Sequence, residues 1–483
     1  MTYTSFTVFK FVLLLFILLS GANIVSTVYA ANGTTETFES FIQKVLDNHE
    51  SLQITKRNIT KTKSDIDAIR SKLGWNLSAS SGLNRSRSFI GAISTQTNLA
   101  LGINKIFQSG DSIELKSSYS IDDSEFVIIN SQANPISSTR VDINYRMHLL
   151  QNKNYSQYLL DETSVDLNYS ESRNIQLITR DEITIQAIEL FYGAAILMAR
   201  LETAKQSITR AKKLKSYIQK NIELGILEKG EILQSSAQLY NLQGQYQELK
   251  LVWEQSEIAI NRLIGNSWDI NFEPRVHFTK NKEYKFKEVS LNVKKYNPAL
   301  KILNLNLKLV ESIIAVDTDN TRSKLDLVIS LGSLNTQGPS AIGSINDNDI
   351  IGGVKLEYNQ ALDERGINNK LYQSQLDKLN VETQILKLEK DLNYDSYSLI
   401  TNIKRATKIN NNYLARHKQE IKKYNDIVKR YRSGRADTNI VIQFENERTQ
   451  AELVYNTQTI LREKTIALLK LKQGKLITNQ VSK

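Results

Sequence analysis

The sequence predicts an α+β protein made mainly of very long helices, with two strand regions and two similar halves. Three observations predict this fold: prolines are rare, apolar residues follow coiled-coil spacing over long stretches, and a strictly alternating pattern replaces that spacing in two places. The chain has 483 residues, of which 41% are hydrophobic, and this fraction is sufficient for a folded protein rather than a disordered one.

The prolines show where long helices cannot lie, because proline breaks helix interiors. There are four of them: Pro135, Pro274, Pro298 and Pro339. In the span before Pro274, apolar residues recur in alternating steps of four and three, with one lysine among them. The series is Ile183, Ala187, Leu190, Ala194, Leu197, Leu201, Ala204, Ile208, Ala211, Lys215, Ile218 and Ile222. This period of 3.5 residues predicts a left-handed supercoil against neighbouring helices.

The span from Ser340 to the C-terminus repeats the helical pattern after Gly366. Its last helix has the same spacing at Ala451, Val454, Gln458, Leu461, Thr465 and Leu468, with two polar residues in the predicted seam. Residues 368–432 would form a rod about 100 Å long, because an α-helix rises 1.5 Å per residue. Such a rod indicates an extended structure rather than a compact enzyme.

Two regions, residues 73–150 and 324–359, alternate between apolar and polar side chains and are predicted to be strands. Examples are "WNLSASSGLN", "SIELKSSYS" and "DLVISLGSLN". Leu, Ile, Val and Tyr on one face with Ser, Asn and Gly on the other suit a strand between lipid and water. A soluble hairpin with one buried face accounts for the pattern equally well.

The N-terminus indicates export. Lys10 precedes an apolar run, and Val28 and Ala30 are small residues of the kind that signal peptidase accepts. Residues 1–30 are therefore predicted to be a signal peptide. The alternative, a retained membrane anchor, is disfavoured because the apolar core from Phe11 to Leu19 is shorter than the roughly 20 residues that a spanning helix needs. No later apolar run approaches that length, so membrane insertion would use strands.

Composition argues against several functional classes. The net charge is +11, but basic residues are interspersed with acidic ones along the helices, so we expect solvated helix faces and no nucleic-acid partner. The chain has no cysteine, and its histidines (His49, His148, His277 and His417) are far apart without metal-ligand spacing. We therefore expect no enzyme, no metal site and no cofactor.

The chain is predicted to be a duplication. Gly225 and Gly434 each interrupt two long helical runs, and aligning them also aligns Tyr246 with Tyr455. Upstream, "SKLGWNLSASSGLN" is similar to "SKLDLVISLGSLN". The predicted repeats are residues 31–268 and 269–483. Each has a helix, a strand region and a long helical hairpin, with the hairpin tips near residues 225–231 and 431–438.

The chain resembles the outer-membrane efflux proteins, the TolC-like exit ducts of Gram-negative bacteria. The resemblance covers nearly the whole mature chain. It is carried by "YRSGRADTNIVIQFENERTQAELVY" at residues 431–455, its counterpart "LGILEKGEILQSSAQL", the "NPAL" that opens the second half, and "NRLIG" at residues 261–265.

The resemblance implies an α+β membrane protein with a long α-helical coiled-coil barrel and a trimeric transmembrane β-barrel. Such a homotrimer in the outer membrane extends into the periplasm. It works with a periplasmic adaptor and an inner-membrane transporter, and passes small molecules or secreted proteins to the exterior. One departure is the first strand region, which has four candidate strands where the simplest family members need two. The alternative is a secreted coiled-coil scaffold or adhesin without channel activity.

The resemblance also implies a periplasmic gate or adaptor-docking tip at the two glycine turns. Glu231 and Tyr431 fall on positions that hold the family's gate, whereas Ala436 and Gln443 replace a basic and an acidic gate residue. The alternative is that Glu231 and Tyr431 are solvated turn residues. The candidate site residues are Gly225, Glu228, Gly230, Glu231, Tyr431, Gly434, Arg435 and Asp437.

Overall fold

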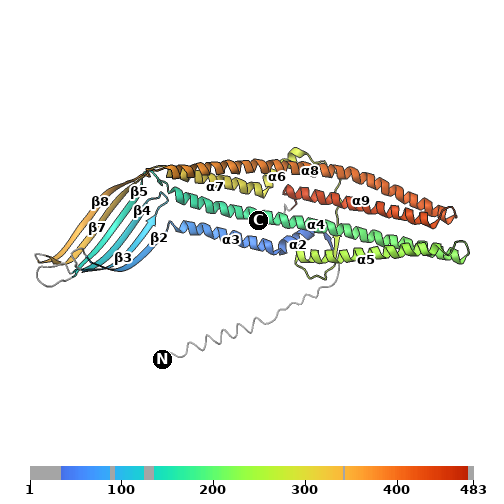
Figure 1. Cartoon of the computed structure of the whole chain (residues 1–483), viewed down its shortest axis with the longest axis horizontal. Coiled ribbons are helices and arrows are strands. Elements are labelled where there is room, and N and C mark those ends of the chain that lie inside the picture. Colours follow the sequence, from blue (N-terminus) through green and yellow to red (C-terminus); the bar gives the residue numbers. More distant parts are fainter. Residues whose placement is uncertain (1–33, 88–92, 125–134, 341–342, 477–483) are drawn as a thin grey trace, which may run out of the picture.

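A computed structural model describes residues 34–87, 93–124, 135–340 and 343–476. The predicted signal peptide lies outside these residues. The described chain is elongated, with one β-sheet at one end and long helices that run side by side away from it (Figure 1). Both hairpin tips lie at the end opposite the sheet (Figure 1).

The two halves of the chain contain the same kinds of elements in a similar order. The first half contains β1 (Thr34–Thr37), α2 (Phe38–Asn48), α3 (Glu50–Ser71), β2 (Trp75–Arg87), β3 (Ile93–Ile106), β4 (Ser112–Ser124), β5 (Ile136–His148), α4 (Ser156–Glu223) and α5 (Glu231–Ile264). The second half contains β6 (Phe272–Arg275), α6 (Phe286–Tyr296), α7 (Pro298–Asn320), β7 (Lys324–Ser340), β8 (Gly343–Asn359), α8 (Arg365–Arg432) and α9 (Thr438–Lys472).

The helices form one layer in which α4 and α8 run the whole length. Each has 68 residues and is therefore about 100 Å long. Next to the sheet, the order across the layer is α3, α4, α7 and α8, whereas near the tips it is α5, α4, α9 and α8 (Figure 1). The shorter helices thus lie end to end beside the two long ones.

The predicted heptad series is shielded from solvent in both α4 and α9, although more of its members are fully buried in α4. No residue of the predicted α4 series is exposed, and Ile183, Ala187 and Ile218 are among its buried members. In α9 no residue of the predicted series is exposed either, but only Ala451 is fully buried, and the other buried apolar residues are Val441, Ile460, Ile466, Ala467, Leu469 and Leu471. Burial on α9 extends beyond the predicted seam, because this helix packs against both α8 and α4.

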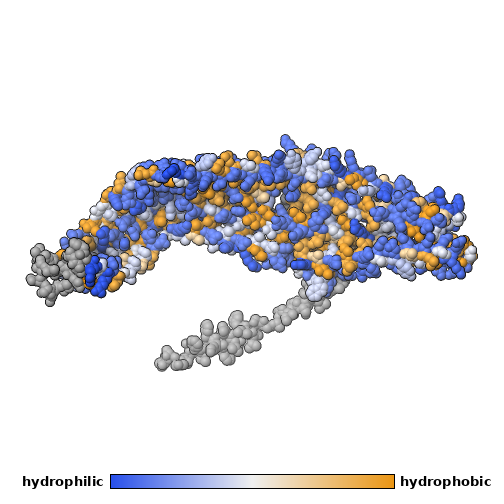
Figure 2. Space-filling model, viewed as in Figure 1, coloured by the Kyte–Doolittle hydropathy of each residue, from blue (hydrophilic) through white to orange (hydrophobic). Residues whose placement is uncertain are grey.

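The main hydrophobic core lies midway along the helices. Phe38 and Phe41 of α2 pack on Phe191 of α4, with ring centroids 5.3 and 5.5 Å apart, and Phe272 of β6 closes the cluster. Beside it, β1 and β6 pair in parallel and tie the two halves of the chain together. Figure 2 shows apolar residues crowded over the middle of the molecule on the face in view.

One helix departs from the expectation that no apolar run after the signal peptide reaches spanning length. A window of α4 is long and apolar enough to cross a bilayer by length and composition. However, 44% of that window is buried inside the protein. Core residues such as Ile188 and Phe191 therefore account for its hydropathy.

The six strands β2 to β5, β7 and β8 form one antiparallel sheet in the order β2-β3-β4-β5-β7-β8. Strand β5 of the first half pairs with β7 of the second half, so both predicted strand regions contribute to one surface. The four candidate strands of the first region all belong to this sheet. Strands β2 and β8 form its two open edges.

Candidate functional site: the sheet and the helical tips

One face of the six-stranded sheet is apolar and exposed. Side chains of directly paired residues share a face, and such pairs place Leu77 beside Ile103 and Ile329 beside Val354. Leu77 is 76% exposed, Leu101 51% and Val354 73%. The same face includes Leu99, Leu115, Tyr119, Val141, Ile143, Leu331, Ile350 and Leu356, all of them exposed. A soluble hairpin would bury such a face, whereas a lipid-facing strand leaves it uncovered by protein.

The opposite face of the sheet is polar and charged. Arg146 of β5 contacts Asp326 of β7 at 2.9 Å and Glu357 of β8 at 2.8 Å. His148 lies 2.7 Å from the same Asp326, and Arg140 contacts Asp142 at 2.6 Å. Ser78, Ser120 and Ser138 share this face, and the last two hydroxyls lie 2.7 Å apart. Charges on one face and exposed aliphatic residues on the other suit a wall between water and lipid.

Aromatic residues gather at the end of the sheet next to the helices. Trp75 begins β2, Phe107 follows β3, and Tyr358 is near the end of β8. The Lys105 ammonium lies 5.5 Å from the Trp75 ring, and the Tyr358 hydroxyl donates to Ser323 at 3.2 Å. Rings with one polar partner are typical of the level where a membrane meets water.

At the other end of the molecule, both hairpin tips turn at a glycine with positive φ. Gly225 has φ 74° and Gly434 has φ 69°. The same bonding pattern follows each glycine: Ile226 N donates to Asn221 O at 2.8 Å, and Arg435 N donates to Arg430 O at 2.9 Å. Each of these hydrogen bonds spans six residues and ends the helix with one residue in the left-handed backbone conformation. Glycine adopts that conformation without a steric penalty because it has no Cβ.

The two tips are packed together within one chain. The buried side chains of Ile218, Tyr431 and Val441 form a tip cluster, with Leu227, Ile232 and Ala436 packed around them. The Tyr217 and Tyr431 rings lie 5.8 Å apart, so α4 and α8 meet here as well. The Gly225 turn of the first hairpin is thereby held against the Gly434 turn of the second.

Three polar side chains at this junction form a hydrogen-bonded group, here named the latch: Glu231, Tyr431 and Thr438. The Tyr431 hydroxyl donates to Glu231 Oε2 at 3.2 Å and lies 2.8 Å from Thr438 Oγ1. The Thr438 hydroxyl also donates to Glu231 Oε2. Tyr431 is 6% exposed. Its burial, together with the nearby Glu231 carboxylate, raises the pKa of Tyr431 to about 12. The phenol therefore stays protonated as a donor at neutral pH.

The remaining predicted site residues lie around the latch without joining it. Asp437 caps α9 by accepting a hydrogen bond from Ile440 N at 2.9 Å, and Arg435 Nε donates to Ser433 Oγ at 3.1 Å. Glu228 and Gly230 are exposed in the turn before α5. Of the eight candidates, only Glu231 and Tyr431 bond across the two hairpins.

Sequence reasoning missed Thr438 and a second polar group where α4 meets α9. Arg210 Nε donates to Glu445 Oε1 at 2.6 Å, and Ser207 Oγ donates to the same oxygen at 3.2 Å. Burial raises the pKa of Tyr424, which packs beside Glu445. A sequence signal existed, because Tyr424 and Tyr431 on α8 and Thr438 and Glu445 on α9 are each spaced by one heptad.

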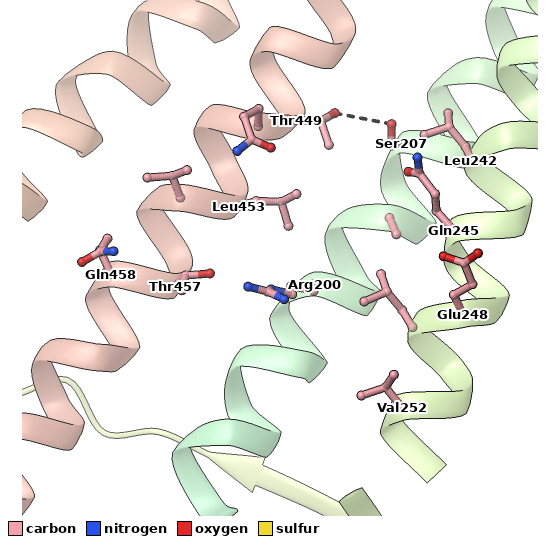
Figure 3. A pocket seen from close by; sticks show the side chains of 14 residues that line it. Arg200, Ser207, Leu242, Gln245, Glu248, Val252, Thr449, Leu453, Thr457 and Gln458 are labelled. Atoms are coloured by element: carbon pink, nitrogen blue, oxygen red, sulfur yellow. Dashed lines mark hydrogen bonds between the residues drawn. The ribbon is translucent and has the colours of Figure 1, made fainter. Parts of the chain in front are cut away.

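Behind this polar group, α5 and α9 leave a groove of about 560 Å³ over α4. Figure 3 shows Arg200 of α4 between Glu248 and Val252 of α5 on one side and Leu453 and Thr457 of α9 on the other. The two hairpins therefore meet mainly through α4 and α9 and at the tips. In the described part of the chain, no group of His, Asp or Glu side chains is arranged to hold a metal ion.

The comparisons with known proteins identify the fold. No protein-family model matches the chain, and no curated protein does either. Solved structures do match, and those described include outer-membrane channels, a transmembrane channel and a membrane protein.

Three of these structures illustrate the likeness. The outer-membrane channel OprN is 12% identical, with 91% of this chain and 90% of OprN covered at a TM-score of 0.66. The outer membrane protein VceC from Vibrio cholerae is 11% identical, with 90% and 96% covered at 0.65. The MtrE outer membrane channel of Neisseria gonorrhoeae, in its open state, is 13% identical, with 91% and 89% covered at 0.62. This chain therefore has the fold of the TolC-like outer-membrane channels.

Proposed function

We propose that three copies of this chain form an outer-membrane exit duct. The strands of the three copies close a β-barrel in the outer membrane, and the helices form an α-barrel that extends into the periplasm. Small molecules or secreted proteins pass through it to the exterior. The likeness to outer-membrane channels supports this role.

The observation that carries the proposal is the six-stranded sheet with one exposed apolar face, one charged face and two open edges. A sheet in a membrane must satisfy all its backbone groups, because lipid offers no hydrogen bonds, so its edges must pair with other strands. Copies of the same chain provide such strands. Closure then turns the apolar face to lipid and the charged face to a water-filled lumen.

The proposal also assigns partners to the two ends of the molecule. Helices about 100 Å long hold the tips far from the membrane-facing sheet. At this distance from the membrane, the tips are where a periplasmic adaptor docks. Cargo from the periplasm or from an inner-membrane transporter enters at the same place. The two halves, residues 31–268 and 269–483, are the two structural repeats of a duplicated chain, each contributing one hairpin to the entrance.

The latch acts as the gate in this proposal. It joins the first hairpin, through Glu231, to the second hairpin, through Tyr431 and Thr438. Each net hydrogen bond is worth only about 1 kcal/mol, so the contact holds a tip closed and still breaks when an adaptor binds. The groove over α4 separates α5 from α9, so these two helices make few contacts that an opening movement would have to break.

Membrane fractionation of the full-length chain in a Gram-negative host tests the proposal. We expect the mature protein in the outer-membrane fraction, as a detergent-stable trimer that dissociates only on heating. A water-soluble protein in the periplasm or medium would contradict it and would favour the coiled-coil scaffold or adhesin.

A further inference from the structure

We propose that β8 of each copy pairs with β2 of the next copy in one defined register, and that this closes an eighteen-stranded barrel from three six-stranded sheets. This inference rests on the proposed trimeric duct and adds its strand number, its joint and its register. The partner that completes the site is a second copy of this chain.

The two open edges are suited to each other. Along the sheet the strands alternate in direction, so β2 runs away from the helices and β8 runs back toward them. Pairing β8 with the next β2 therefore keeps the antiparallel alternation while all helices stay on one side of the membrane. Pairing β2 with a second β2 would be antiparallel only if one copy were inverted, with its helices on the other side.

The register follows from the stagger of the strands. Directly paired residues form one line across the sheet, which joins Trp75, Lys105, Ile113, Tyr145, Ile329 and Val354. Trp75 is the first residue of β2, at the helix-proximal end, whereas Val354 lies five residues before the helix-proximal end of β8 at Asn359. The line therefore climbs about one residue per strand as it crosses the sheet.

Extending the same stagger across the joint, which threefold symmetry makes identical in all three places, gives the register with the next copy. After one more strand the line has climbed about six residues above the level of Trp75, so Val354 lies opposite Ser81. The same register places Leu356 opposite Ala79 and Tyr358 opposite Leu77. All of these side chains belong to the apolar face, as a continuous barrel requires, since a slip by one residue would turn one strand's apolar side chains into the lumen.

The resulting geometry is that of an ordinary membrane barrel. A climb of one residue per strand corresponds to a strand tilt of roughly 35°, within the range that barrels adopt. Each strand of the sheet has 13 residues or more, and about 9–11 tilted residues suffice to cross a bilayer.

The strand number also matches the helical layer. Six tilted strands about 4.8 Å apart take up roughly 35 Å of circumference. The four helices next to them, α3, α4, α7 and α8, take up roughly 32–40 Å at 8–10 Å spacing. Sheet and helices therefore meet at nearly equal width, whereas four strands would cover only about 24 Å. The extra strands of the first half thus widen the barrel to about 35 Å between opposite backbones.

Cysteine cross-linking of the trimer tests the joint, and the chain has no native cysteine to interfere. We expect the double variant Ala79→Cys with Leu356→Cys to form disulfide-linked dimers and trimers, with loss of the monomer band under non-reducing denaturing conditions. Directly opposite residues have Cβ atoms close enough for a disulfide. The pair Ser81→Cys with Val354→Cys gives the same result if the first pair does not assemble.

The matched control is Ala79→Cys with Lys355→Cys, whose side chains lie on opposite faces and should leave the monomer band intact. Efficient linkage of Ala79→Cys with Tyr358→Cys instead would overturn the register. A conducting trimer in which none of these cysteine pairs forms a disulfide would contradict the proposed β8–β2 pairing and would still support the exit duct. A chain that forms no trimer at all would overturn the proposed function itself.

Discussion

At the scale of single residues, Tyr431 connects the two hairpins, because it is buried in the tip cluster and bonds to both other members of the latch. We expect Tyr431→Phe to keep the packing and remove the hydrogen bonds, at a cost of about 1 kcal/mol. Channel openings in planar bilayers should become about fivefold more frequent. Tyr240→Phe, which changes an exposed tyrosine on α5, is the control, and equal behaviour of both variants would argue against the latch.

The raised pKa of Tyr431 has a consequence at alkaline pH. An unfolded tyrosine ionises near pH 10, whereas burial raises the pKa of Tyr431 to about 12. The folded tip therefore binds more protons in this window. Its extra stability is complete below about pH 10 and is lost as the pH rises toward 12. The tyrosinate absorbance of the wild type minus that of Tyr431→Phe should report this titration, and ionisation near pH 10 would contradict the burial.

The glycines of the tips make a separate prediction. Gly434→Ala places a Cβ on a residue with φ 69°, although no atom lies within 4 Å of that Cβ. Backbone strain alone should lower the free energy of unfolding by about 1 kcal/mol. Gly230→Ala is the matched control, since φ there is −64° and the space is equally open, so it should be neutral or slightly stabilising. Equal effects in thermal melts would contradict this account.

At the scale of elements, the two faces of the sheet should differ in how well they tolerate a charged side chain. Leu99 and Asn98 are neighbours on β3 with side chains on opposite faces. Leu99→Lys places a charge on the apolar face and should destabilise the membrane-inserted trimer by about 2–4 kcal/mol, whereas Asn98→Lys should be tolerated in the lumen. Urea unfolding in lipid vesicles measures both, and the opposite order would mean that the lipid-facing side is assigned wrongly.

The sequence predicted most elements because their patterns are local. The strands lie within the two regions of alternating apolar and polar residues. The long helix predicted from residue 368 corresponds to α8. Burial on α9 extends beyond the predicted seam because it depends on two neighbouring helices rather than on one. Thr438 and Glu445 were missed because a polar residue in a heptad looks the same whether it is solvated or bonded to another hairpin.

At the scale of the whole molecule, the sheet lies at one end and the two hairpin tips, packed together, lie at the other, joined by long helices (Figure 1). The pairing of β5 with β7 could not be predicted from sequence, because it joins residues about two hundred positions apart. That single pairing combines both strand regions into one wall and leaves one open edge on each side. The proposed assembly follows from those edges.

The most direct test of the exit duct is the conductance of the purified trimer in planar lipid bilayers. The account predicts discrete single-channel steps for the wild type and more frequent openings when the latch is removed by Glu231→Ala or Tyr431→Phe. A correctly folded trimer that inserts no conducting channel, with or without the latch, would contradict it.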